Sequence, residues 1–170
     1  MKHTVLKKAV LFVIFTCFLA ACSAVTVFAE SGNPEGVSAQ AANDPDRQKK
    51  EKIVSLVNQE RAKAGLKEVT IDETMMTGAN IRAKEIQSLF SHTRPDGRDC
   101  FSVFTDLGIS SNYRGENVLY ASICSPETVM SGWMSSEGHK GVILDARFTR
   151  IGVGYFESSG IGYWVQIFAE

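Results

Sequence analysis

The C-terminal end of the chain constrains the fold most strongly, because two β-rich runs stand close together there. The runs are residues 151–156 and 163–168, and the segment 157–162 between them contains two glycines. β-Branched and aromatic residues on both sides of a glycine-bearing turn are typical of an antiparallel hairpin. We therefore expect the chain to end in an antiparallel sheet, against which the earlier elements pack.

Three earlier segments have apolar residues at helical spacing instead. They span residues 44–65, 72–92 and 125–138. Asp44 and Pro45 suit the start of a helix, Gly65 suits the end of one, and Pro95 prevents the second from continuing. Between the second and third segments, residues 101–108 fit a short helical turn and residues 117–121 a strand. Helices followed by antiparallel strands favour an α+β domain over a doubly wound sheet.

The N-terminus predicts export. Residues 9–29 contain no formally charged side chain and follow a start with three lysines, so we expect residues 1–29 to be a signal peptide that ends at the small residue Ala29. Residues 19–22, Leu-Ala-Ala-Cys, also resemble a bacterial lipobox, in which Cys22 would carry a lipid. An uncleaved apolar run of this length would suffice to anchor the chain in a bilayer. All three alternatives place the rest of the chain outside the cytoplasm, either secreted or attached to the cell envelope, and only the last two involve a membrane.

The chain beyond the predicted signal is mildly acidic. The first 29 residues hold three of the 18 Lys and Arg and none of the 19 Asp and Glu, which leaves a net charge of about −4. That balance offers no basic stripe for nucleic acid, so we expect no nucleic-acid partner. Residues 30–46 are rich in small and polar residues and predict a flexible leader, and residues 47–170 suit one compact domain.

Several common catalytic motifs are absent from the sequence. It contains no GxSxG elbow, no HExxH, no phosphate-binding GxxxxGK[ST] and no DxDxDG calcium loop. Gly152 and Gly154 lack the third glycine of a dinucleotide fingerprint, so we interpret them as strand residues that another backbone or a bulky side chain approaches closely.

The histidines are scarce enough to single out a candidate site. His3 lies in the predicted signal, which leaves His92 and His139, each near the expected end of a helix, while Glu116 precedes the expected strand. Two neutral imidazoles and one carboxylate are the ligand set of many open zinc sites, although this spacing forms no local ligand signature. The alternative is structural: each histidine caps a helix end and Glu116 fixes a loop.

Two cysteines fall inside the predicted domain. In an oxidising compartment Cys100 and Cys124 could form a disulfide, or each could be a separately buried thiol. Their spacing is a poor signal for zinc. The sequence leaves these two alternatives open.

Five ordered motifs resemble one family. They are VNQERAKAGL at residues 57–66, FSHTRPDG at 90–97, RGENV at 114–118, GWMSSEGHKGVIL at 132–144 and the pair of runs within 148–169. They resemble the bacterial, SCP-like branch of the CAP superfamily, which is named after cysteine-rich secretory proteins, antigen 5 and plant pathogenesis-related proteins. The resemblance implies a three-layer α-β-α sandwich with a central antiparallel sheet.

The same resemblance implies a surface cleft lined by two histidines and two acidic residues. His92, Glu116 and His139 match three of these four positions. The fourth is Ser136 in this chain, and Glu137 beside it would substitute only if the turn directed it inward.

Three functions are compatible with these residues. The first is a binding module whose cleft holds a divalent cation (zinc, calcium or magnesium) or a small ligand, with no cofactor required. The second is a hydrolase, either a protease or an envelope-directed enzyme. In it His92 or His139 is the base and Glu116 orients it, or both histidines hold a zinc ion that activates water. The third is a structural role in the cell envelope. The expected partner is an unidentified small ligand or an envelope component.

Overall fold

The computed structural model describes residues 45–123 and 125–170. The predicted signal peptide with Cys22, residues 30–44 of the predicted leader, and Cys124 lie outside the described residues. No helix within the described ranges is long and apolar enough to cross a membrane.

A four-stranded sheet lies at the centre of the described domain, with the strand order β1-β3-β4-β2. Its strands are β1 (Thr70–Ile71), β2 (Arg114–Ser122), β3 (Arg150–Ser158) and β4 (Ile161–Ala169). The three long strands are antiparallel as predicted, whereas the two-residue β1 runs parallel to β3, which makes the sheet mixed.

The predicted C-terminal hairpin is present with a tighter turn than expected. Strands β3 and β4 extend to Ser158 and from Ile161, so only Ser159 and Gly160 connect them. Both residues have positive φ angles, 51° and 77°. A two-residue turn of this kind matches the natural twist of the strands it joins.

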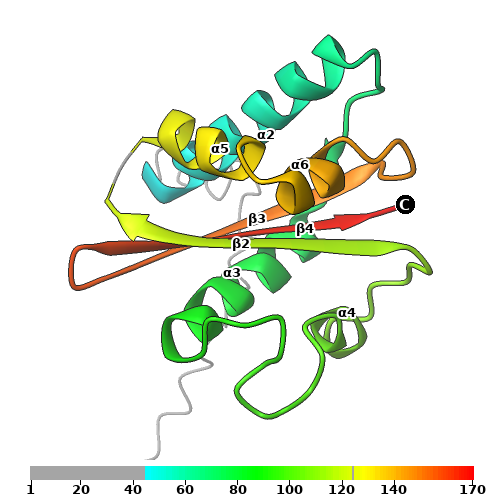
Figure 1. Cartoon of the computed structure of the whole chain (residues 1–170). Helices are drawn as coiled ribbons and strands as arrows, with labels where there is room; N and C mark the ends of the chain where they lie inside the picture. The colour runs from blue at the N-terminus through cyan, green and yellow to red at the C-terminus, as the bar shows by residue number, and fades with distance from the viewer. Residues whose placement is uncertain (1–44, 124) are drawn as a thin grey trace, which may run out of the picture. The chain divides into compact units, whose positions relative to one another are not determined.

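Helices cover both faces of the sheet (Figure 1). Helices α2, α5 and α6 lie on one face, and α3 and α4 lie on the other. Their bounds are α2 (Pro45–Lys63), α3 (Glu73–Ser88), α4 (Ser102–Asp106), α5 (Pro126–Met134) and α6 (Glu137–Ile143). A separate apolar core fills each of the two interfaces, and Trp133 and Trp164 are buried in the core on the side of α2, α5 and α6. The arrangement confirms the α+β sandwich.

Helix α3 packs directly on β3 because β3 contains two glycines. A Cβ atom at Gly152 would collide with the backbone of Met75, and one at Gly154 with the backbone of Ala79. The predicted close approach of another backbone is therefore confirmed, and it brings the C-terminal half of α3 over β4 and β2, where the candidate site lies.

The third predicted helix, residues 125–138, is in fact two helices. Helix α5 ends at Met134, where the Ser135 hydroxyl donates a hydrogen bond back to the carbonyl of Gly132, and α6 begins at Glu137. A serine that bonds to the preceding turn competes with continuation of a helix. His139 consequently lies within α6 and not at a helix break as the sequence pattern suggested.

Arg61 joins α2 to the segment around α6 and is completely buried. Its guanidinium donates hydrogen bonds of 2.8 to 3.0 Å to four backbone carbonyls, those of Lys67, Ile143, Asp145 and Phe148. These bonds satisfy carbonyls at the end of α6 and fix the helix that carries His139.

Candidate functional site

Glu116 is the centre of the candidate site, and its side chain is only 1% exposed. Strand β2 directs it toward the α3 face of the sheet, where the Arg82 guanidinium donates from Nε to Oε2 at 2.8 Å and from Nη2 to Oε1 at 3.2 Å. Burial alone would raise the pKa of Glu116, but the hydrogen bonds with His92 and Arg82 outweigh burial and hold the pKa below its usual value. Glu116 is therefore a buried carboxylate ion with a fixed orientation.

His92 lies over this carboxylate. Its Nδ1 is 2.8 Å from Glu116 Oε1, while its side chain remains 58% exposed. The hydrogen bond with Glu116 raises the pKa of His92, with burial acting in the opposite direction. Because a carboxylate only accepts, Nδ1 carries the hydrogen, and in the neutral ring Nε2 is left with its lone pair available.

Arg82 is one of two residues of this site that sequence reasoning did not assign to it. It is 0% exposed and also bonds to Glu85 at 2.7 Å and to the carbonyl of Ser91 at 2.8 Å, so it holds the segment that leads to His92. Its position in the apolar stripe of α3, next to Ala83 and one turn before Ile86, was the available signal. A cation among buried apolar positions needs a buried partner.

His139 approaches the site from the opposite helical layer. Asn117, the neighbour of Glu116 in β2, donates a hydrogen bond from its amide to the His139 backbone carbonyl at 3.1 Å, which ties α6 to this strand. Burial lowers the pKa of His139, and the positive charge of His92 lowers it further. The His139 ring is not part of the group of ligand atoms formed by His92, Cys100 and Glu116, so its links to the site are this backbone bond and the charge of His92.

Cys100 joins the cluster although the sequence did not assign it to a site. One ligand atom each from His92, Cys100 and Glu116 lie within 4.8 Å of one another. Burial, helped by the charges of Glu116 and Asp99, raises the pKa of the Cys100 thiol to about 12. Cys100 is a free, buried cysteine here; Cys124 lies outside the described part of the chain, so their pairing stays a prediction.

The fourth predicted cleft position differs from the other three. Ser136 occupies the N-cap position of α6 and Glu137 its first turn, and Glu137 is exposed. Neither side chain forms a hydrogen bond with His92, Glu116 or His139 among the described residues. The site described here therefore consists of His92, Glu116, His139, Arg82 and Cys100.

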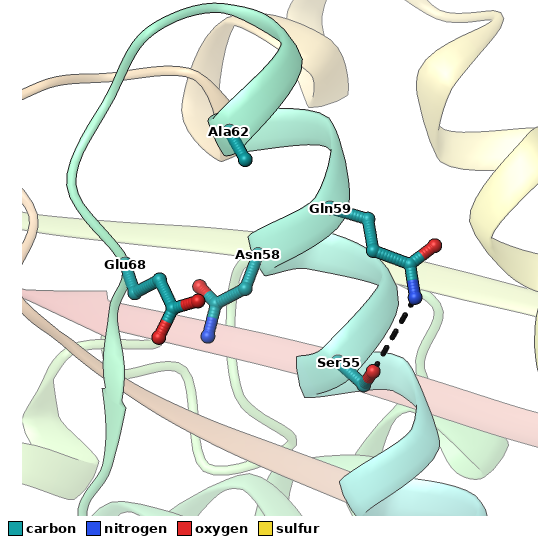
Figure 2. A pocket seen from close by; sticks show the side chains of 5 residues that line it. All are labelled: Ser55, Asn58, Gln59, Ala62 and Glu68. Carbon is teal, nitrogen blue, oxygen red and sulfur yellow. Dashed lines mark hydrogen bonds between the residues drawn. The ribbon is translucent and has the colours of Figure 1, made fainter.

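A polar pocket of about 370 Å3 lies against helix α2 (Figure 2). It is lined by Ser55, Asn58, Gln59, Ala62 and Glu68. The Asn58 side chain donates a hydrogen bond to the backbone carbonyl of Val69 at 3.0 Å and accepts one from its N–H at 2.9 Å. With one carboxylate and no imidazole or thiol in its lining, this pocket is not a second metal centre.

Comparisons with known proteins bear on the family and the fold of this chain. Residues 54–168 match the model of the cysteine-rich secretory protein family, CAP. Over 119 residues the chain is 41% identical to the uncharacterized protein YkwD of Bacillus subtilis, which covers 69% of this chain and 45% of that protein. A membrane protein of the same organism, YlbC, also uncharacterized, is 26% identical over 137 residues, or 77% of this chain and 39% of the relative. The chain thus spans less than half the length of these curated relatives.

Two solved structures share the fold. One is an extracellular protein containing an SCP domain from Bacillus anthracis, with a TM-score of 0.66 and 24% identity over 75% of this chain and 44% of that one. The other is an outer surface protein of Borrelia burgdorferi, with a TM-score of 0.64 and 20% identity over 71% of this chain and 90% of that one. Because the family model spans most of the described residues and the fold agrees, the chain belongs to the cysteine-rich secretory protein (CAP) family.

Proposed function

We propose that this domain is an extracytoplasmic binding module that holds a divalent cation through Nε2 of His92, with His139 as a second ligand. The hydrogen bond between His92 Nδ1 and Glu116 Oε1, 2.8 Å long, carries the proposal. Metal-binding histidines commonly donate their other ring nitrogen to a carboxylate, which fixes the tautomer and the orientation of the ring. His92 has this arrangement and an exposed ring.

Glu116 positions His92 in this proposal and is not itself a ligand. Both of its oxygens already accept hydrogen bonds from Arg82, and Oε1 also contacts His92. A cation bound directly to this carboxylate would lie next to the guanidinium charge, and the two positive charges would repel each other. Of the three residues predicted from the sequence, His92 and His139 are therefore the proposed ligands, and Glu116 positions His92.

The donor atoms favour zinc among the cations predicted from the sequence. Imidazole nitrogens suit zinc and other transition metals, whereas calcium and magnesium prefer several oxygen ligands. Of the two carboxylates whose charge acts on His92, Glu116 has both oxygens in hydrogen bonds, and Asp99 accepts from the backbone N–H of Phe101. Cys100 would join as a ligand only by losing a proton that its raised pKa retains.

The location outside the cytoplasm rests on two supports. One is the predicted signal at residues 1–29, and the other is that the structural neighbours are described as an extracellular protein and an outer surface protein. Attachment to a membrane through Cys22 or an uncleaved signal remains the alternative to secretion, and a small ligand or an envelope component remains the proposed partner.

Isothermal titration of the purified chain with zinc, calcium and magnesium chloride tests the cation site. We expect one zinc to bind, with no heat from calcium or magnesium, and we expect His92→Ala to abolish the zinc heat. Glu68→Gln, which removes a carboxylate from the distant pocket of Figure 2, serves as the control and should bind zinc like the wild type. Absence of zinc heat, or full retention of it in His92→Ala, would refute the proposal.

The hydrolase hypothesis shares the hydrogen bond between His92 and Glu116, which would orient His92 as a base, but it lacks a paired nucleophile. No hydroxyl side chain in the described ranges forms a hydrogen bond with His92 or His139, so neither imidazole is paired with an activated serine or threonine. Cleavage of a peptide substrate by the wild type and not by His92→Ala would establish it.

A further inference from the structure

Strand β2 is an edge of the sheet, and one of its two sides has no backbone partner among residues 45–123 and 125–170. It pairs with β4 over all nine of its residues, and the strand order places nothing beyond it. No backbone hydrogen bond joins the outer side of β2 to any other described residue. An unpaired edge strand is a ready template for another extended chain.

The register of the β2–β4 pairing identifies which backbone N–H and C=O groups of β2 point away from β4. Hydrogen bonds run from Glu170 N to Tyr113 O and from Ile123 N to Gly160 O, both in register with the β2–β4 ladder. In an antiparallel pair such bonded positions alternate with unbonded ones, so odd-numbered residues of β2 bond to β4 and even-numbered ones direct N–H and C=O to the open side. The exposed residues of this second set are Arg114 at one end of β2 and Tyr120 and Ser122 at the other.

An aromatic pocket lies beside this same end of β2. It has a volume of about 190 Å3 and is lined by Ile86, Gln87, Phe90, Tyr120 and Tyr163. Phe90 and Tyr120, 50% and 55% exposed, stand edge to face with ring centroids 4.7 Å apart. Exposed apolar side chains gathered in this way mark an interaction site more often than chance exposure does.

We propose that the outer edge of β2 from Val118 to Ser122 binds an extended polypeptide as an added strand, with one bulky apolar side chain of that peptide in the pocket formed by Phe90 and Tyr120. The backbone groups of Tyr120 and Ser122 provide the main-chain hydrogen bonds. A ligand residue opposite Tyr120 presents its side chain on the face where the pocket lies. This inference is independent of the proposed cation site.

A peptide accounts for both features at once. A sugar or a lipid would use the aromatic rings but leave the row of N–H and C=O groups unpaired, whereas an added strand satisfies them and fills the pocket. The pocket lining contains no formally charged side chain, which suits an apolar residue. Main-chain bonds supply affinity and the pocket supplies selectivity in such recognition.

Hydrogen exchange provides the test. A phage-displayed library of random linear dodecapeptides is selected on the purified chain, and an enriched peptide is synthesised and added to it. We expect the amides of Leu119 and Ala121 to exchange slowly already in the free chain, and those of Tyr120 and Ser122 to become slow only with the peptide. No enriched peptide, or protection elsewhere with Tyr120 and Ser122 unchanged, overturns the proposal.

Two variants separate backbone recognition from other uses of the surface. Ser122→Pro removes an outward N–H without touching the ladder to β4, and Phe90→Ala removes a pocket wall that lies outside the sheet. Each variant should lower the affinity for the peptide about tenfold or more, roughly the contribution of one hydrogen bond or one buried ring edge. Ser122→Ala should bind the peptide as the wild type does.

Equal binding by all three variants contradicts the proposal. So does sedimentation of the peptide-free chain as a dimer that Ser122→Pro dissociates, because that result assigns the edge to a second copy. Binding to phosphatidylglycerol vesicles that Phe90→Ala abolishes would assign the pocket to a membrane instead. His92→Ala should bind the peptide normally, which keeps this test separate from that of the cation site.

Discussion

At the scale of single residues, the buried pair of Arg82 and Glu116 determines what the site can do. The carboxylate is held from both sides, and its orientation fixes which nitrogen of His92 faces outward. Sequence reasoning singled out the histidines by their scarcity and Glu116 by its place before an apolar strand, and the resemblance to a family matched all three. It missed Arg82, because a positively charged residue in a helical stripe normally predicts a solvent-exposed face.

Replacing Glu116 by Gln should destabilise the protein by about 3 kcal/mol, because it leaves a buried guanidinium without its charged partner. Urea unfolding measures the change. Glu51→Gln is the matched control, since Glu51 also pairs with an arginine, Arg47, but is 47% exposed, and its loss should cost less than about 1 kcal/mol. Equal losses in the two variants would show that Glu116 is not a buried ion pair partner.

Arg61→Met should also cost about 3 kcal/mol or more, because four carbonyls lose their donor while the apolar part of the side chain is kept. Arg61→Lys should recover little of this, since a single ammonium group cannot reproduce the planar set of donors. Thermal unfolding compares the three proteins, and a lysine variant as stable as the wild type would contradict this account.

At the scale of elements, the close contact between α3 and β3 determines where the candidate site lies. The pattern of the sequence located both elements and indicated that Gly152 and Gly154 are approached closely. It did not indicate that the third helix is broken at Ser135, because residues 135–138 contain no apolar side chain that would mark a boundary and the deciding hydrogen bond is local. His139 was therefore assigned to a helix end when it lies inside α6.

Two glycine substitutions test this contact. Gly154→Ala should destabilise the protein by about 1 to 3 kcal/mol or more, since the new methyl group meets the backbone of Ala79. Gly141→Ala, in helix α6 with no atom within 4 Å of the added Cβ, should stabilise it by about 0.5 to 1 kcal/mol. Opposite signs in urea unfolding confirm the packing, and a neutral Gly154→Ala would refute it.

At the scale of the whole domain, buried and half-buried carboxylates should make the free energy of unfolding depend on pH in the acidic range. Hydrogen bonds and arginine partners outweigh burial and lower the pKa of Asp72, Glu85 and Glu116. A carboxylate with a lowered pKa contributes stability above its unfolded value of about 4 and loses it as the pH falls through the folded value.

The urea midpoint should accordingly be similar at pH 6 and pH 5 and fall steeply from about pH 4 to pH 3. Glu85→Gln removes one of these carboxylates and should flatten the decline. A midpoint at pH 3 equal to that at pH 6 would contradict the lowered pKa values.

The overall architecture was predictable because it follows from patterns that repeat along the chain. Helical spacing, strand composition and a glycine turn gave the layers and their order, and the five motifs gave the family. The parallel pairing of β1, only two residues long, and the inclusion of Cys100 near His92 depend on contacts between distant segments. No local spacing encodes them.

The most direct test of the cation site is anomalous diffraction at the zinc absorption edge from a crystal of this chain soaked in zinc. The account predicts a single strong peak about 2.1 Å from Nε2 of His92, with His139 as a further ligand and Arg82 still bonded to Glu116. A peak bound directly to the carboxylate of Glu116 or to Cys100 Sγ, or no peak at His92, would contradict it.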